Sequence, residues 1–407
     1  MLHSVVQMNK EQKAQYAQFI EQRLTIDGFE DKAVNSLIKY YNVAKKGVVK
    51  DINRSIKKNL NHPSRARLTT LYKEIDTKIK VLTDKLTKPL AKSIGEAGAY
   101  SYKDTNRILS WEGHVKGYNN VARSATQIAS MVQDEKLGGK CLDDWLWSAL
   151  REENGSLKSE VAAAQIRGIG YKQLMKELPS RYNNMLSAKG NKQNIETVAK
   201  SYIQAANAKA HEDIYEANKN IIDKVEWSAI MENGNVSTGK GTCPRCAALD
   251  GSTYPSVSKG PSCPLHPRCR CMYLPITKSW KDMGYDIEEL EPIYNKWYIR
   301  SPGRKILQKG TIDGNYADWW YTRSKKFQDN SMGPTRSELL RTRQIDFSDL
   351  VDKKGNLILL NDMDITTISI RPSLNVPYAY STILDNSIFG EDGSVLFRSL
   401  TLGDCDE

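Results

Sequence analysis

The sequence predicts an α+β protein whose N-terminal two-thirds is predominantly α-helical, followed by a small β-hairpin and loop module and short C-terminal strands. Three observations lead to this fold class. Apolar residues recur at helical spacing through roughly the first 230 residues. Five of the seven cysteines fall between Gly241 and Ile276. Two short segments rich in β-branched and aromatic residues flank that cysteine-rich loop.

The clearest helical segment carries a heptad pattern. Its apolar residues alternate in steps of four and three, and charged residues occupy the positions between them. This spacing places one apolar seam on one helix face, which favours an intramolecular helical hairpin over a long free coiled coil. A break is expected at residues 61–67, "NHPSRAR", and one long helix at residues 195–222. The seam residues are Leu68, Tyr72, Ile75, Ile79, Leu82 and Leu86.

Strand character begins near Lys224. The segment "KVEWSAI" predicts a strand that leads into the cysteine loop, and "CMYLPI" at residues 271–276 predicts the returning strand. Further on, residues 316–343 predict helices on both sides of a Gly-Pro break. Residues 346–372 alternate in the manner of short strands and turns.

Composition restricts the class of protein. The chain has 407 residues, of which 40% are hydrophobic and 26% charged, so it is long enough for two or three globular domains. No run of about 18 apolar residues occurs, and the N-terminal segment turns polar after six residues. We therefore expect no membrane partner and synthesis in a reducing cytoplasm, where cysteines stay as thiols or bind metal.

The basic charge of the chain is concentrated in one region. The formal net charge is +11, and the segment from Lys45 to Lys103 holds 15 basic against 5 acidic residues. The last 37 residues instead hold 2 basic and 6 acidic residues. Such a balance is compatible with a nucleic-acid partner, because Lys and Arg displace counterions from phosphates. Ordinary solubility charge is the alternative.

Two groups of soft ligands bracket the cysteine loop. A Cys-x-x-Cys pair opens it, and a His-x-x-Cys-x-Cys group closes it. A Cys-x-x-Cys turn lets two thiolates converge on one tetrahedral ion, and zinc accepts mixed sulfur and imidazole ligands without redox chemistry. The module is therefore expected to be zinc-stabilised, with Cys263 the least certain participant. The candidate ligands are Cys243, Cys246, His266, and Cys269 or Cys271.

Three other uses of the loop stay open at this point. A disulfide knot suits a secreted peptide better than this chain, and a thioredoxin-like redox motif would require a βαβ pattern that the sequence lacks. A catalytic Cys–His pair is the third. Elsewhere there is no P-loop, H-E-x-x-H or G-x-S-x-G motif, so we expect no catalytic residues and no enzymatic activity.

Three motifs taken together resemble the phage Mu F-like minor head proteins, a family of phage head morphogenesis proteins. They are "EWSAI", "TCPRCAALDGSTY" and "PLHPRCRC" followed by an apolar strand. The resemblance covers about Gly168 to Asp362. Its closing part includes Trp320, Gly333, Arg336 and the stretch from Asp349 to Asp352. One departure is that Gly239, Lys240 and Gly241 stand where the family often has an acidic residue.

The resemblance implies a minor capsid protein of a tailed bacteriophage that acts in head morphogenesis near the portal, and in genome packaging or ejection. The implied partners are the portal protein, the scaffold or major capsid protein, and packaged double-stranded DNA. Such a protein would be made in the host cytoplasm and located in the virion, in the capsid interior or at the portal vertex. By motif position, the ligands are again Cys243, Cys246, His266 and Cys269 or Cys271.

Two alternatives for the whole protein remain, a nucleic-acid-binding zinc-ribbon protein and an effector or toxin enzyme fused to a head-protein core.

Charge distribution, helix breaks and the resemblance together suggest how the chain is divided. The predicted divisions are a basic helical region at 1–135, the helical part of a head-protein core at 136–223, the zinc and cysteine loop module at 224–278, the C-terminal part of that core at 279–362, and an acidic extension at 363–407.

Overall fold

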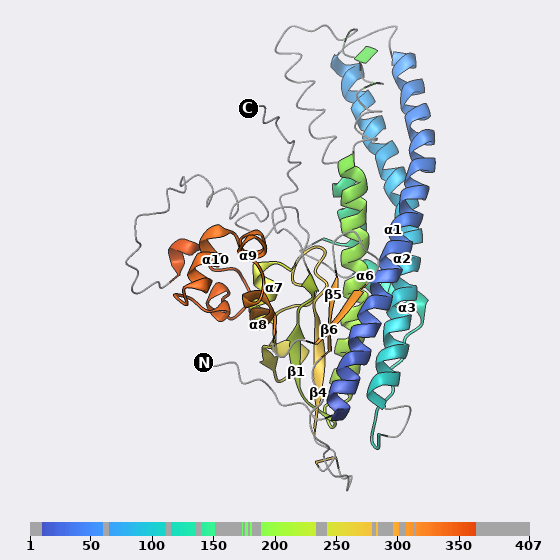
Figure 1. Ribbon diagram of the computed structural model, residues 1–407. Helices are drawn as coiled ribbons and strands as arrows, with labels where there is room; N and C mark the ends of the chain where they lie inside the picture. Colours follow the sequence, from blue (N-terminus) through green and yellow to red (C-terminus); the bar gives the residue numbers. More distant parts are fainter. Residues whose placement is uncertain are drawn as a thin grey trace, which may run out of the picture. The chain divides into compact units, whose positions relative to one another are not determined.

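A computed structural model gives the structure of the chain (Figure 1). It describes residues 10–59, 65–110, 115–134, 140–150, 173, 176, 177, 180, 189–232, 242–278, 282, 283, 296–300, 307–311 and 315–363. These residues are mainly helical with small β-sheets, which confirms the predicted fold class. None of the described helices combines the length and the apolarity that crossing a bilayer requires.

The chain forms two compact units, and each combines segments that are distant in the sequence. The mixed unit contains Met1–Leu24, Tyr102–Val121 and Ala208–Glu407. The helical unit contains Thr25–Ser101 and Ala122–Asn207. The predicted divisions are continuous stretches instead, and their assignment to a head-protein core stays a prediction. The acidic extension from residue 364 onward lies outside the described residues.

The helical unit is built from parts of three long helices. They are α1 (Lys10–Asn59), α2 (Arg65–Ser110) and α6 (Lys189–Ala217). Helix α1 ends at Asn59 and α2 begins at Arg65, which confirms a helix break here, but residues 65–67 of the predicted segment are helical. Helix α6 begins and ends several residues earlier than the predicted helix at 195–222.

The predicted heptad seam is buried along the part of α2 whose side chains are described. Ile79, Leu82 and Leu86 have no exposed surface, and the buried seam continues in steps of four residues to Leu90 and Ile94. Burying each such side chain contributes about 1.5–3 kcal/mol. The seam therefore holds α2 in the unit and leaves its charged residues on the opposite, exposed face.

Two glycines allow close packing on α2. A Cβ atom at Gly95 would overlap the carbonyl oxygen of Ala125, at the start of α3 (Ala125–Asp134). A Cβ atom at Gly98 would lie 2.7 Å from Cγ2 of Ile128. Only a residue without a side chain permits this separation of the two helix backbones.

The mixed unit contains a three-stranded antiparallel sheet in the order β3-β1-β4. Its strands are β1 (Ile222–Ser228), β3 (Thr253–Tyr254) and β4 (Met272–Thr277). The pairing of β1 with β4 confirms the two strands predicted on either side of the cysteine loop. Strand β3 lies inside that loop and pairs with β1, which the sequence analysis did not predict.

Aromatic side chains hold this sheet to α6. Trp227 has no exposed surface, and its ring meets the ring of Tyr273 edge to face at 5.2 Å between centroids. The hydroxyl of Tyr215 on α6 donates a hydrogen bond of 3.1 Å to the backbone carbonyl of Tyr273. The edge-to-face geometry adds to the stabilisation from buried area. Sheet and helix thus form one core within the mixed unit.

Short C-terminal strands occur, but earlier in the chain than their predicted place. Strand β5 (Lys296–Arg300) pairs antiparallel with β6 (Leu307–Thr311) and parallel with β2 (Met231–Glu232). The expectation of strands at 346–372 is wrong for its described part, residues 346–363. This part forms two single-turn 3₁₀-helices and one isolated bridge, from Val351 to Leu357. Its charged and polar residues cap turns instead of pairing in a ladder.

Three short helices follow the sheets: α8 (Tyr316–Tyr321), α9 (Lys325–Met332) and α10 (Pro334–Arg341). The predicted Gly-Pro break is confirmed, because Gly333 adopts φ +81° between α9 and α10. The indole of Trp320 donates a 2.8 Å hydrogen bond to Ser331 and packs on Phe347. These helices form a small aromatic core of their own.

Candidate metal centre

The first half of the cysteine cluster is placed by one short helix, α7 (Pro244–Leu249). Cys243 is its N-cap, and Pro244 occupies the first helical position, where its missing N–H is not needed. The backbone N–H of Cys246 points at the Cys243 sulfur, 3.5 Å away. One helical turn therefore brings both thiols of the Cys-x-x-Cys motif to the same side.

The second half is placed by a tight turn before β4. The N–H of Cys269 donates a 3.0 Å hydrogen bond to the carbonyl of His266. Arg268 adopts a left-handed conformation, with φ +60°, which closes the turn. Cys271 lies two residues after Cys269 and directly before the first residue of β4. The pairing of β4 with β1 thus returns the second group of ligands to the first.

The structure brings all five predicted ligands into one cluster. Cys243 and Cys246 each have their Sγ atom 3.2 Å from Nε2 of His266. The Sγ atoms of Cys246 and Cys269 are 3.8 Å apart. The ligand atoms form two overlapping groups, Cys243–Cys246–His266 and Cys246–Cys269–Cys271, and within each group all lie within 4.8 Å of one another. Cys246 belongs to both groups and is the centre of the cluster.

A backbone contact sets the orientation of the imidazole. Nδ1 of His266 lies 2.8 Å from the carbonyl oxygen of Pro267. A carbonyl can only accept a hydrogen bond, so Nδ1 carries the proton and donates. Nε2 then faces Cys243 and Cys246. This arrangement, in which the distal nitrogen is held by a backbone carbonyl, is typical of histidines that bind metal.

Cys263 does not join either group. Its thiol donates to the backbone carbonyl of Cys271 at 3.1 Å. Burial raises the pKa of the Cys263 thiol well above its ordinary value, which favours the neutral form. Cys263 therefore acts as a hydrogen-bond donor that helps to hold the turn.

Negative charge is favoured on two thiols of the cluster, Cys243 and Cys269. The hydrogen bond from Cys246 and the nearby His266 hold the pKa of Cys243 well below its ordinary value, although burial opposes them. Hydrogen bonds from Cys246 and Cys271 lower the pKa of Cys269 in the same way. Burial lowers the pKa of His266, but the Cys243 and Cys269 thiolates overcome this effect and raise it to about 10. The lowered pKa values make Cys243 and Cys269 the cysteines of the cluster that deprotonate most readily.

Three of the ligand separations are close to those around a tetrahedral ion. With Zn–S bonds of about 2.3 Å and Zn–N bonds of about 2.1 Å, tetrahedral angles place two sulfurs about 3.8 Å apart and a sulfur and a nitrogen about 3.6 Å apart. The Cys246–Cys269 distance of 3.8 Å matches the first value. The two sulfur–nitrogen distances of 3.2 Å are slightly shorter than the second. Cys246 and Cys269 are almost fully buried, at 2% and 1% exposure, so water does not compete for them.

The six cysteines that the structure describes are free thiols. The 3.8 Å between Cys246 and Cys269 is almost twice the length of a disulfide bond. The disulfide-knot alternative therefore has no support among these residues. Cys405 lies outside them.

Sequence reasoning missed two buried carboxylates beside the cluster. Asp250, at the end of α7, accepts hydrogen bonds from the backbone N–H groups of Ala229 (2.6 Å) and Tyr316 (2.7 Å). Glu226 on β1 is 8% exposed, and burial together with the charge of Asp250 raises its pKa to about 8. The only sequence signal for Asp250 was its place in "ALDG", directly after the Cys-x-x-Cys turn. Asp250 joins the cysteine loop to both β1 and α8.

A buried histidine lies apart from the cluster. The ring of His211 on α6 is 1% exposed, and its Nε2 atom lies 2.8 Å from Oε1 of Gln22. Burial and the nearby Arg23 lower the pKa of His211 to about 3, so the imidazole is neutral. It stacks on Tyr215 and is part of the helical packing of the mixed unit.

The chain was compared with protein-family models, with curated proteins and with solved structures, and none of the three comparisons gave a match. The geometry of the cluster therefore carries the functional argument.

Proposed function

We propose that the Cys/His cluster holds a structural zinc ion, bound by Cys243, Cys246, His266 and Cys269. The observation that carries this proposal is the 3.8 Å separation of Cys246 and Cys269, together with the orientation of His266. Cys271 is the alternative fourth ligand. The ion would join the N-terminus of α7 to the turn before β4 and so hold a loop with few apolar residues.

The metal is tested by elemental analysis of full-length protein purified without added metal. About one zinc ion per chain is expected, because a closed structural site of this kind is four-coordinate. Removal of the ion by a chelator should be accompanied by unfolding of the loop, because metal binding and folding are coupled in such sites. Metal-free protein that folds equally well under strong reductant would contradict the proposal.

We further propose that the chain is a minor head protein of a tailed bacteriophage, with the zinc loop as a structural clamp. The resemblance to Mu F-like head proteins supports this, because it rests on the ligand motifs and on the strand that follows them. The partners would be the portal protein and the scaffold or major capsid protein. The location would be the capsid interior or the portal vertex.

Mass spectrometry of virions and procapsids from the phage that encodes the chain tests this function. The chain should be found at low copy number relative to the major capsid protein, and a portal gene should lie immediately upstream of its gene. Absence from both particles would exclude a head protein. The zinc site would still be tested by its own measurement.

A further inference from the structure

The net charge of the chain lies almost entirely on one helical hairpin. Residues 45–92 hold 14 basic residues and 4 acidic residues, a net charge of +10. The remaining 359 residues hold 45 basic and 44 acidic residues, a net charge of +1. The hairpin belongs to the helical unit and lies outside residues 168–362, where the resemblance to head proteins was found. We propose that this hairpin, the end of α1 and the start of α2, binds the phosphate backbone of double-stranded DNA.

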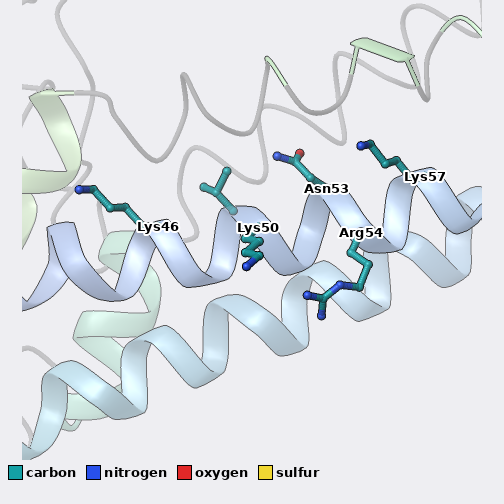
Figure 2. A pocket seen from close by; sticks show the side chains of 6 residues that line it. Lys46, Lys50, Asn53, Arg54 and Lys57 are labelled. Atoms are coloured by element: carbon teal, nitrogen blue, oxygen red, sulfur yellow. The ribbon is translucent and has the colours of Figure 1, made fainter.

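The basic residues of α1 form a continuous exposed row. Lys46, Lys50, Arg54 and Lys57 are exposed and line one surface hollow along successive turns of the helix (Figure 2). Their spacing of three or four residues places neighbouring charges about 5–6 Å apart along the axis, over a total of about 16 Å. A row of this length can contact several consecutive phosphates.

Helix α2 extends the same charge. Its buried seam leaves lysines exposed on the opposite face, over a length of about 40 Å from the start of α2 to residue 92. One turn of DNA is about 34 Å long, so the hairpin can follow the duplex for a full turn. The exposed lysines of this stretch are Lys73, Lys80, Lys85, Lys88 and Lys92.

Compensating acidic groups are sparse on this surface. Asp51 is shared between Arg54, at 3.4 Å, and Lys78, at 3.8 Å. Burial lowers the pKa of Lys45, and repulsion from Lys192 and Lys46 adds to this effect. A bound polyanion would relieve that repulsion.

The side-chain chemistry favours duplex DNA over other anionic partners. The 14 basic residues are 11 lysines and 3 arginines, whereas protein interfaces are depleted of lysine. Among the described side chains of residues 45–92, Val81 is the exposed large apolar residue, and Tyr40 and Val43 are exposed just before this stretch on α1, so the basic surface itself offers little apolar area to a protein partner. Tyr72 is the single aromatic residue between 45 and 92, and single-strand binding requires aromatic platforms. Phosphate contacts of this kind carry no base specificity.

Fluorescence anisotropy with the full-length protein and a labelled DNA duplex of about 30 base pairs tests the proposal over a range of salt concentrations. The variant is Lys46→Gln/Lys50→Gln/Arg54→Gln/Lys57→Gln. The matched control, Lys259→Gln/Lys326→Gln/Lys353→Gln/Lys354→Gln, removes the same charge from exposed positions of the mixed unit. Helical circular dichroism verifies that both variants fold.

The wild type should bind with a steep salt dependence, and the control should behave like it. The α1 variant should bind about tenfold or more weakly at low salt, with the slope of log K against log salt reduced by about 3–4, because each lost phosphate contact contributes about 0.9. Equal losses in the two variants would overturn the proposal, as would equal affinity for a single strand. Competition by polyglutamate as strong as by DNA would instead indicate an acidic protein partner. Protein treated with a chelator should bind DNA as tightly as untreated protein. The DNA proposal can therefore hold or fail independently of the zinc proposal.

Discussion

At the scale of single residues, the chemistry of the cluster depends on small local contacts. The proton on Nδ1 of His266 is held by the carbonyl of Pro267, and this contact turns Nε2 toward the thiols. Cys263 belongs to the same loop, but its thiol is bonded to a backbone carbonyl. Cys263 therefore has a different role from the ligand cysteines, although it lies only a few residues from Cys269.

Substitutions should separate those roles. Cys246→Ser should abolish metal binding, because Cys246 lies in both ligand groups. Cys263→Ser should keep about one ion per chain, because a hydroxyl can make the same hydrogen bond. Cys141→Ser, a free cysteine outside the cluster, is the control for the loss of a thiol. Elemental analysis of the purified variants gives the result, and metal retention by Cys246→Ser would refute the ligand assignment.

Glu226 should make stability depend on pH. Its pKa is raised from 4.5 to about 8 by burial and by Asp250, with Lys224 opposing. The folded protein therefore keeps a proton that the unfolded chain releases, so stability is full below pH 4.5 and is lost as the pH rises toward about 8.

Glu226→Gln should remove this loss, so its stability relative to wild type should be greater at pH 8 than at pH 5 by about 3 kcal/mol. Urea unfolding of both proteins across this range measures the difference, from which pH effects common to both cancel. Asp223→Asn, at an exposed position of the same strand, should leave the pH profile unchanged. Parallel profiles for wild type and Glu226→Gln would show that the carboxyl is ionised in the fold without cost.

At the scale of elements, helix packing decides which glycines matter. The sequence shows Gly47 and Gly95 as similar interruptions of helical segments. In the structure, a Cβ atom at Gly47 has nothing within 4 Å, whereas one at Gly95 would overlap the backbone of Ala125. The same residue type is therefore dispensable on α1 and required on α2.

Gly95→Ala should destabilise the protein by about 1–3 kcal/mol, because helix backbones must move apart to fit the methyl group. Gly47→Ala should stabilise it by about 0.5–1 kcal/mol, because it raises helix propensity without a clash. Thermal or urea unfolding of the two variants makes a direct comparison. Equal effects would mean that α2 and α3 do not pack as described.

At the scale of the whole molecule, the cysteine loop and the helical unit are stabilised by different interactions. The helical unit buries a continuous apolar seam. The loop between β1 and β4 is held by polar and sulfur contacts, with Asp250 joining it to β1 and α8. Loss of a metal should therefore affect the two units unequally.

Removal of zinc should raise amide hydrogen exchange in residues 242–278 much more than in residues 65–101. The first segment depends on the ion for its shape, whereas the second is held by buried apolar side chains. Hydrogen exchange with mass spectrometry, before and after chelation, measures both segments in one sample. A uniform increase across the chain would indicate that metal stabilises the whole fold.

The sequence by itself determined the helical character, the break near residues 61–67, the two strands around the loop and the candidate ligands, because these depend on local spacing and residue type. The tertiary structure decided what depends on contacts between distant residues. It added β3 to the sheet, moved the C-terminal strands to 296–311, and buried Glu226 and Asp250. It also separated Cys263 from the ligands, since one hydrogen bond to Cys271 turns its thiol to the backbone. The spacing of residues in the sequence does not predict this hydrogen bond. The Cys-x-x-Cys and His-x-x-Cys-x-Cys motifs come together only when β4 pairs with β1.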